Sequence, residues 1–196
     1  MNNLLGLVLT VAIGASGSSA PFTPISAKIK VIRVVFRDGA EVSRSEKVGS
    51  FFRAKNGSVL TQWLDAEGRP TEGELVDNLS LAQYNIQYAS KRVLKVRALK
   101  KAVLPAPPPQ NGKSLPTDVV DGVPCTVMPV TLLEGLTSQD IGTACLAAEY
   151  GLTVKLDYKK PQGDGTSVHT TRLIYNISVE EPPPELFTLS GFTVRE

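Results

Sequence analysis

The sequence is poor in the side chains that build metal centres and acid–base relays. Among its 196 residues there is one histidine, His169, and there are two cysteines, Cys125 and Cys145. A metal site with several protein ligands needs more of these residues, and no glycine-rich phosphate-binding motif is present. No nucleophile beside a base and no paired carboxylates stand out either. We therefore expect a protein that is not an enzyme, with no cofactor and no metal site.

An excess of charge of one sign is also missing. The 21 Lys and Arg residues nearly balance the 19 Asp and Glu residues, which leaves a net charge of +2. Nucleic-acid binding needs a concentrated basic surface, so we expect no nucleic-acid partner. The hydrophobic content of 42% is that of an ordinary globular chain, and the length suits a single core.

The N-terminus has a short apolar run with no Lys or Arg before it. Residues 4–13, LLGLVLTVAI, are too few to span a bilayer and precede the small-residue stretch GASGSSA. This order predicts a signal peptide over residues 1–17, cleaved after Gly17 or as late as Ala20. The alternative is an apolar N-terminus that is retained. We expect residues 18–196 to be exported, to be periplasmic or secreted, and to contain no transmembrane segment.

Because we expect the chain to be exported, we predict a structural role for the two cysteines. Cys125 and Cys145 lie 20 residues apart, and in an oxidising compartment such a pair predicts a disulfide rather than a reactive thiol. If residues 123–130 and 143–150 are antiparallel neighbours connected around Gly135, the two cysteines lie directly opposite each other. The competing reading is a free cysteine nucleophile paired with His169, for which no third orienting group is present.

The body of the chain reads as short strands separated by turns. Residues 28–37 alternate in two registers, which predicts a β-bulge or a strong bend. Asp38-Gly39 and Asn56-Gly57 are turn signals, the second typical of a two-residue hairpin, and another turn falls at residues 66–70. Further strands are predicted in residues 73–81, 82–90, 91–99, 119–130, 151–160 and 167–180. This succession predicts a mainly β fold with an antiparallel meander.

Two segments affect the domain organisation. The proline-rich residues 105–116, PAPPPQNGKSLP, cannot continue a sheet, because proline supplies no donor to the ladder. We interpret them as a connection within one domain, since two halves of about 80 residues would each leave several strand edges unpaired. Residues 138–150 fit either a helix that begins at Ser138 and ends at Gly151 or a strand.

Part of the sequence resembles a group of exported bacterial proteins. The stretches concerned are DVVDGVPC (118–125), YNIQYASKRVLKVRAL (84–99) and residues 149–189. The last of these contains Tyr175-Asn176-Ile177 and then an acidic, proline-rich turn that ends in Leu186-Phe187. On these residues the chain resembles the periplasmic lipoprotein carrier (LolA/LolB-like) half-barrel superfamily.

The resemblance implies a fold and a class of ligand. It implies an antiparallel sheet curled into an incomplete barrel, with at most one or two short helices and a strand at residues 143–149. The concave apolar face is expected to be covered by a helix or loops, and in the carriers it holds acyl chains. No catalytic residue is carried over.

Other candidate residues have a plainer interpretation beside the functional one. The basic run 91–101 fits anionic headgroups or an acidic partner, but its alternation favours a solvated strand. His169 reads as an exposed residue at the start of a strand, and Trp63 as core rather than a binding platform. The remaining carboxylates form no recognisable pair: Asp157, Asp164, Glu180, Glu181 and Glu185.

Two functional hypotheses follow. The first is a non-enzymatic envelope protein that binds a lipid or another hydrophobic ligand on the concave face of a curled sheet. The alternative is a structural or protein-interaction module of the cell envelope, with a filled core, no ligand and an envelope protein as partner. The residues that bind a ligand are not identified by the sequence.

Overall fold

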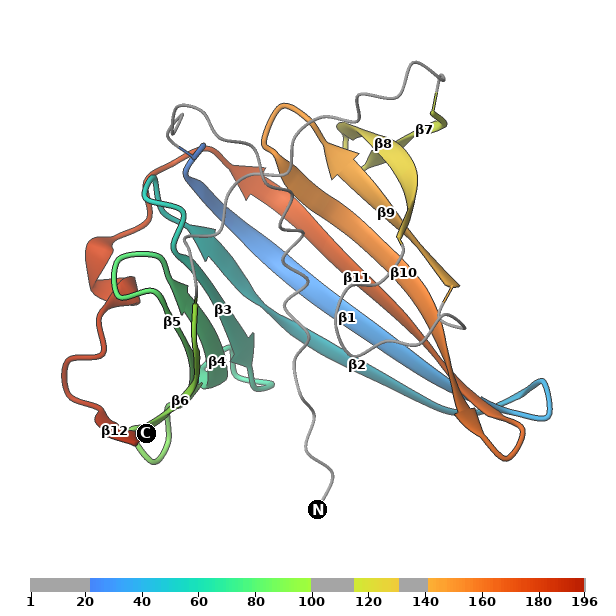
Figure 1. Ribbon diagram of the computed structural model, residues 1–196, viewed down its shortest axis with the longest axis horizontal. Helices are drawn as coiled ribbons and strands as arrows, with labels where there is room; N and C mark the ends of the chain where they lie inside the picture. Colours follow the sequence, from blue (N-terminus) through green and yellow to red (C-terminus); the bar gives the residue numbers. More distant parts are fainter. Residues whose placement is uncertain (1–21, 100–114, 131–140, 196) are drawn as a thin grey trace.

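The computed structural model describes residues 22–99, 115–130 and 141–195 (Figure 1). These residues form one curled, open sheet of 12 strands and one 3-10 turn, so the mainly β, half-barrel prediction is confirmed. The predicted signal peptide and most of residues 105–116 lie outside the described ranges. The elements are β1 Ile25–Arg37, β2 Ala40–Arg53, β3 Val59–Leu64, β4 Pro70–Asp77, β5 Ala82–Gln87, β6 Arg92–Ala98, β7 Thr117–Val120, β8 Val123–Val130, β9 Ile141–Ala147, β10 Leu152–Gly163, β11 Thr166–Ser178, η1 Pro184–Phe187 and β12 Thr193–Arg195.

The chain builds the sheet from its middle. The strand order is β12-β6-β5-β4-β3-β2-β1-β11-β10-β9-β8-β7, so β1 lies next to β11 at the centre. The first half runs outward from β1 to β6, and the second half runs inward from β7 to β11. Every pairing is antiparallel except that of β12, which lies parallel to β6 at one edge. Both halves of the chain therefore belong to one continuous sheet.

The turns follow the local sequence, with two corrections. Asp38-Gly39 and Asp164-Gly165 have positive φ angles and close two-residue hairpins, as expected for such pairs. Asp121-Gly122 does the same, so residues 119–130 are a hairpin and not the single strand that we predicted. Asn56-Gly57 does not form a two-residue hairpin.

The loop around Asn56-Gly57 is longer because Ser58 is held away from the ladder. Strand pairing ends at Arg53 with Val59, and the Ala54 amide donates to the Ser58 carbonyl oxygen. The Ser58 hydroxyl donates to Asp77 and accepts from the Asn78 amide. At Gly57, with φ +81°, a Cβ would lie 2.3 Å from the Phe22 ring, so only glycine fits there.

The change of phase in residues 28–37 has a cause other than a bulge within them. β1 pairs with β11 in unbroken register from Lys28 to Arg37. The pattern changes because opposite faces of the same strand are buried at its two ends: Ile29 near the start and Val34 near the end, at 3% and 8% exposed. The irregularity lies beside β1, on β2, where an extra residue stands opposite Val35 and Phe36.

The sheet has an inner and an outer face, which are packed differently. We call the concave face, which carries Ile29, the inner face and the opposite face the outer face. The inner face holds a cluster of Ile25, Ala27, Ile29, Phe51 and Ile174. The outer face of β3–β6 holds a second cluster of Leu60, Leu75, Ile86 and Val93, against which Leu186, Phe187, Leu189 and Phe192 pack.

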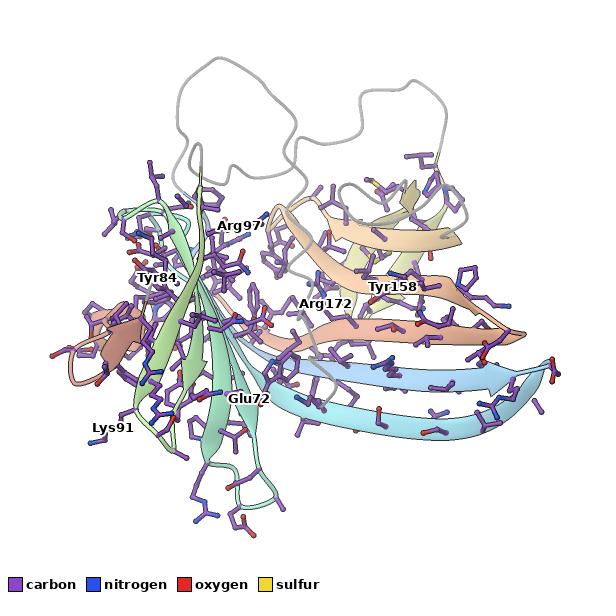
Figure 2. All side chains as sticks on the ribbon, turned by 60° about the horizontal axis from the view of Figure 1, so that its bottom comes forward. Glu72, Tyr84, Lys91, Arg97, Tyr158 and Arg172 are labelled. Carbon is purple, nitrogen blue, oxygen red and sulfur yellow. A yellow bond between two sulfur atoms is a disulfide. The ribbon has the colours of Figure 1, made fainter. Side chains whose placement is uncertain are left out.

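Among the described residues, the 3-10 turn η1 does not cover the concave face of the sheet. The resemblance implied a helix or loops over the concave face, but η1 and the residues after it lie on the outer face of β3–β6 (Figure 1). Figure 2 shows Tyr84 on this side, toward η1, whereas Tyr158 and Arg172 lie within the concavity. The apolar C-terminal segment is thus used to complete the outer cluster.

A disulfide joins Cys125 to Cys145, with a register that differs from the one expected. The S–S distance is 2.13 Å and the Cα–Cα distance is 5.3 Å. Val127, not Cys125, stands opposite Cys145, so the two cysteines are diagonal neighbours on β8 and β9. Both are buried, in a third cluster with Ala147 and Val154. Residues 141–147 form a strand, which decides the described part of the ambiguous segment in favour of the strand.

Candidate functional site

The inner face combines apolar and charged side chains in neighbouring rows. Strand register places Ile29 beside Gly49, Gly49 beside Trp63, and Trp63 beside Glu72. The next row contains Arg172, Val31 and Lys47. Partners that are directly opposite in antiparallel strands point to the same face. The inner face therefore changes from mainly apolar to mainly charged between one row of side chains and the next.

The apolar end of the inner face is built around β1. Its buried cluster is extended by partly buried side chains of Val59, Trp63, Tyr150, Leu152 and Ile177. Trp63 thus lies at the border of the cluster and is partly buried. The Lys47 ammonium lies 5.8 Å from the centre of the Trp63 ring, and it also forms an ion pair with Glu72 at 3.2 Å. Trp63 accordingly has an apolar neighbourhood on one side and a charged one on the other.

The charged part of the inner face brings together groups from opposite limbs of the sheet. Burial raises the pKa of Glu74 on β4, and the positive charges of Arg172 on β11 and of Lys47 oppose that rise. In a flat sheet β4 and β11 would lie roughly 19 Å apart, at ~4.8 Å per strand. The charges of Glu74 and Arg172 influence each other because the sheet is curled.

Arg172 is the central cation of this group. Burial lowers the pKa of Arg172, while Tyr158 and Glu74 favour its charged form. Figure 2 shows Arg172 and Tyr158 projecting from neighbouring strands into the concavity, with Glu72 on the facing limb. A guanidinium with several directed donors suits an anionic group such as a carboxylate or phosphate. The arrangement is therefore able to hold the polar end of a ligand.

Arg53 is a buried cation with a structural role. It is 4% exposed, and burial lowers the pKa of Arg53 to about 10. Its guanidinium donates to the carbonyl oxygens of Thr23, Tyr150 and Gly151 at 2.5–3.2 Å. These hydrogen bonds join the start of the described chain and the β9–β10 turn to the end of β2. The sequence offered no signal for this role, because its partners are backbone groups far along the chain.

His169 lies outside the inner face. It is exposed on β11, in agreement with expectation, beside an open hollow of about 530 Å³ near the tips of the two long hairpins. Strand register places its ring on the outer face, opposite Val34 and Lys159. The hollow is lined by Phe36, Gly39, Lys159, Pro161, Gly165, Ser167 and His169. The side chains with polar groups in this lining are those of Lys159, Ser167 and His169.

The other predicted site residues are dispersed. Asp157 accepts a hydrogen bond from Thr171 and pairs with Lys155 at 3.4 Å, whereas Asp164 lies in a turn. Glu181 accepts from the Lys55 amide. The basic run is divided between the two faces of β6, where Lys95 shares a face with buried Val93 and Arg97 donates to Gln83. No group of three or more His, Cys, Asp and Glu side chains in the described ranges is placed to hold a metal ion.

Comparisons with known proteins support the fold only. Neither a protein-family model nor a curated protein matches the sequence. Among solved structures, a LolA superfamily protein from Nitrosomonas europaea is similar, at 8% identity and a TM-score of 0.41, over 83% of this chain and 90% of that one. An uncharacterised conserved protein from Thermus thermophilus is similar at 6% identity and a TM-score of 0.50, over 88% and 90% of the two chains. At these identities the similarity concerns the fold alone.

Within the described residues, no helix has both the length and the apolar character needed to cross a membrane.

Proposed function

We propose that this protein is a non-enzymatic, exported protein that binds a lipid-like ligand on the inner face of its sheet. The apolar part of the ligand would lie over the cluster around Ile29 and Phe51. Its polar or anionic end would lie near Arg172 and Tyr158. The observation that carries the proposal is the direct succession of an apolar and a charged row inside one concavity.

Physical chemistry favours an amphipathic ligand over a purely apolar one. Glu74 and Arg172 are partly buried, and partial burial of a charge costs free energy unless polar partners replace water. A headgroup that bonds to the guanidinium would supply such partners, and a chain of methylene groups would contribute about 0.8 kcal/mol for each group that it buries. The expected ligand therefore has one charged or polar end and one acyl-like end.

Export is part of the proposal and is supported by the disulfide. Cys125 and Cys145 are paired, and disulfides persist mainly in oxidising compartments. The apolar run at residues 4–13 agrees with the same location. We accordingly place the mature chain in the periplasm or outside the cell.

The first test is native mass spectrometry of the mature protein purified from its own envelope, followed by organic extraction and lipid analysis. We expect a bound acyl-chain species near unit stoichiometry. A clean apo mass, with no lipid taken up on titration, would overturn the proposal. That result would favour the alternative of an interaction module with a filled core.

The second test locates the ligand. Trp63 is the only tryptophan and borders the inner cluster, so it is a native energy donor for a dansyl-labelled fatty acid. We expect energy transfer from Trp63 in a saturable titration. Val31→Glu, on the inner face, should abolish the transfer. Ile32→Glu is the matched control, because Ile32 is its neighbour on β1 with similar burial but points to the outer face. Equal loss in both variants would argue against the inner face.

A further inference from the structure

The first part of β2, Ala40–Val48, has one edge that pairs with no described strand. β3 pairs with β2 only from Gly49 to Arg53, so the backbone of Ala40–Val48 has a strand neighbour on one side, β1. All nine of these residues are exposed. Figure 1 shows β2 running past the end of β3 to the tip of the long hairpin, with no other described strand along its outer edge. Such an edge presents unpaired N–H and C=O groups.

This edge is well formed for strand addition. From Ser43 to Val48, β2 is in regular register with Val35 to Lys30 of β1, which is itself paired on its other side with β11. The segment contains no proline, and the single bulge falls before Ser43. Val42 and Val48 are 54% and 39% exposed at the two ends of this segment. A second strand would therefore find a straight ladder flanked by two apolar side chains.

The sequence of the edge is complementary to itself when it is read antiparallel. A two-fold axis at Ser45 places Arg44 opposite Glu46 of a second copy, and Glu46 opposite Arg44, on the outer face. Within the regular ladder, the same axis places Ser43 opposite Lys47. The pair of opposite charges is thus formed twice, as expected of an isologous interface.

Neighbouring registers are less favourable. Two identical strands that pair antiparallel about a two-fold axis must place one residue opposite itself if their free backbone groups are to match. An axis at Arg44 would oppose two guanidinium groups, and an axis at Glu46 would oppose two carboxylates. Like charges directly opposite each other are destabilising. Ser45 is the position that avoids both.

We propose that Ser43–Val48 of β2 is a self-association surface, at which two copies of this chain pair antiparallel about Ser45 and join their sheets. Glu46 already contacts Lys30 at 2.9 Å, so the Arg44 side chain of the second copy would complete a three-membered charge network. The interface is short and polar, which corresponds to a weak, concentration-dependent dimer. This inference does not depend on the proposed ligand.

Charge exchange tests the pairing. Arg44→Glu and Glu46→Arg should each weaken the dimer at least tenfold in sedimentation equilibrium, because each variant opposes like charges. Mixed together, the two variants should form a heterodimer, since every opposed pair is then Glu with Arg. The double variant R44E/E46R should dimerise as the wild type does. Both positions are exposed, and a thermal melt checks that the fold is kept.

Cysteine cross-linking tests the register. The two native cysteines are joined, so an introduced cysteine is the only free thiol. Under mild oxidation Ser45→Cys should yield a covalent dimer, and the matched variant Ser43→Cys should not, because only Ser45 faces its own copy. A wild type that stays monomeric at millimolar concentration, or equal cross-linking at the two positions, would overturn the proposal.

Discussion

The two faces of the β3–β6 limb differ in what packs against them. On the outer face Leu60, Leu75 and Val93 are at most 1% exposed and are covered by the C-terminal segment around η1. On the inner face the same strands present polar groups such as Thr61 and Glu74. Successive side chains of β4 therefore point alternately into the packed outer cluster and into the charged concavity.

This contrast indicates how the sheet remains stable although its inner face carries polar and charged side chains. An antiparallel sheet needs one well-packed face, and the second is free to face solvent or a ligand. Here the C-terminal segment supplies the packing from outside. The stability of the limb and the composition of the concavity are thus carried by different residues.

The largest expected effect comes from breaking the outer cluster. Leu75→Ala should lower the free energy of unfolding by about 2–5 kcal/mol, because it removes a fully buried side chain. On the inner face, Val31→Ala should cost only about 1 kcal/mol. Urea denaturation measures both, and Leu79→Ala, at a position 78% exposed, is the control. An equal loss at Val31 would indicate a filled inner core and remove the contrast.

The next largest effect is expected in the other limb of the sheet, which is stabilised by the Cys125–Cys145 disulfide and not by the C-terminal segment. Replacing Cys125 and Cys145 together by Ala should lower the free energy of unfolding by about 3 kcal/mol, the value for a loop of this size. A reductant should reproduce the loss in the wild type and leave the double variant unchanged. A reductant effect on the double variant would mean that the loss has another origin.

The sequence allowed much of this architecture to be predicted. The Asp38-Gly39 pair marked one of the hairpins correctly, because positive φ angles at both turn positions are accessible to few residues. The disulfide was predicted from its spacing and compartment. The register of the two strands was not predicted, because a shift of two residues keeps the same side chains on the same face. Such a shift still allows a disulfide between diagonal neighbours.

Features that depend on tertiary structure could not be read in advance. The phase change in β1 looked like a bulge, because alternation cannot distinguish an irregular strand from one that is buried on opposite faces at its ends. The coupling of Glu74 with Arg172 joins residues 98 positions apart and exists only when the sheet curls. Likewise, the apolar C-terminal residues gave no sign of which face they would cover.

A smaller effect is expected at the junction between the two limbs. Arg53 bonds three carbonyl oxygens, and Lys in its place retains the charge but not the planar fork. Arg53→Lys should therefore cost about 1–3 kcal/mol through carbonyl groups that lose a donor. Arg97→Lys is the control, because Arg97 is an exposed arginine that bonds one side chain, Gln83. Similar losses in the two variants would contradict the role of Arg53 as a clamp.

The smallest expected effect is a difference in pH dependence between two carboxylates. Burial raises the pKa of Glu74, so the folded state holds a proton that the unfolded state has lost, and the stability contribution of Glu74 falls as the pH rises above its ordinary value of 4.5. Asp65, on the exposed β3–β4 turn, has the opposite sign. Its hydrogen bond from the Arg69 amide lowers the pKa of Asp65, so its contribution is present above 3.8 and is lost as the pH falls.

Unfolding curves from about pH 3 to about pH 7 separate the two signs. The stability of Glu74→Gln relative to the wild type should rise with pH, whereas that of Asp65→Asn should decline. Parallel curves for the two variants would mean that Glu74 is as well solvated as a carboxylate on a surface turn. The inner face would then have lost the buried charge that distinguishes it from an ordinary sheet surface, and with it the reason to expect a headgroup beside Arg172.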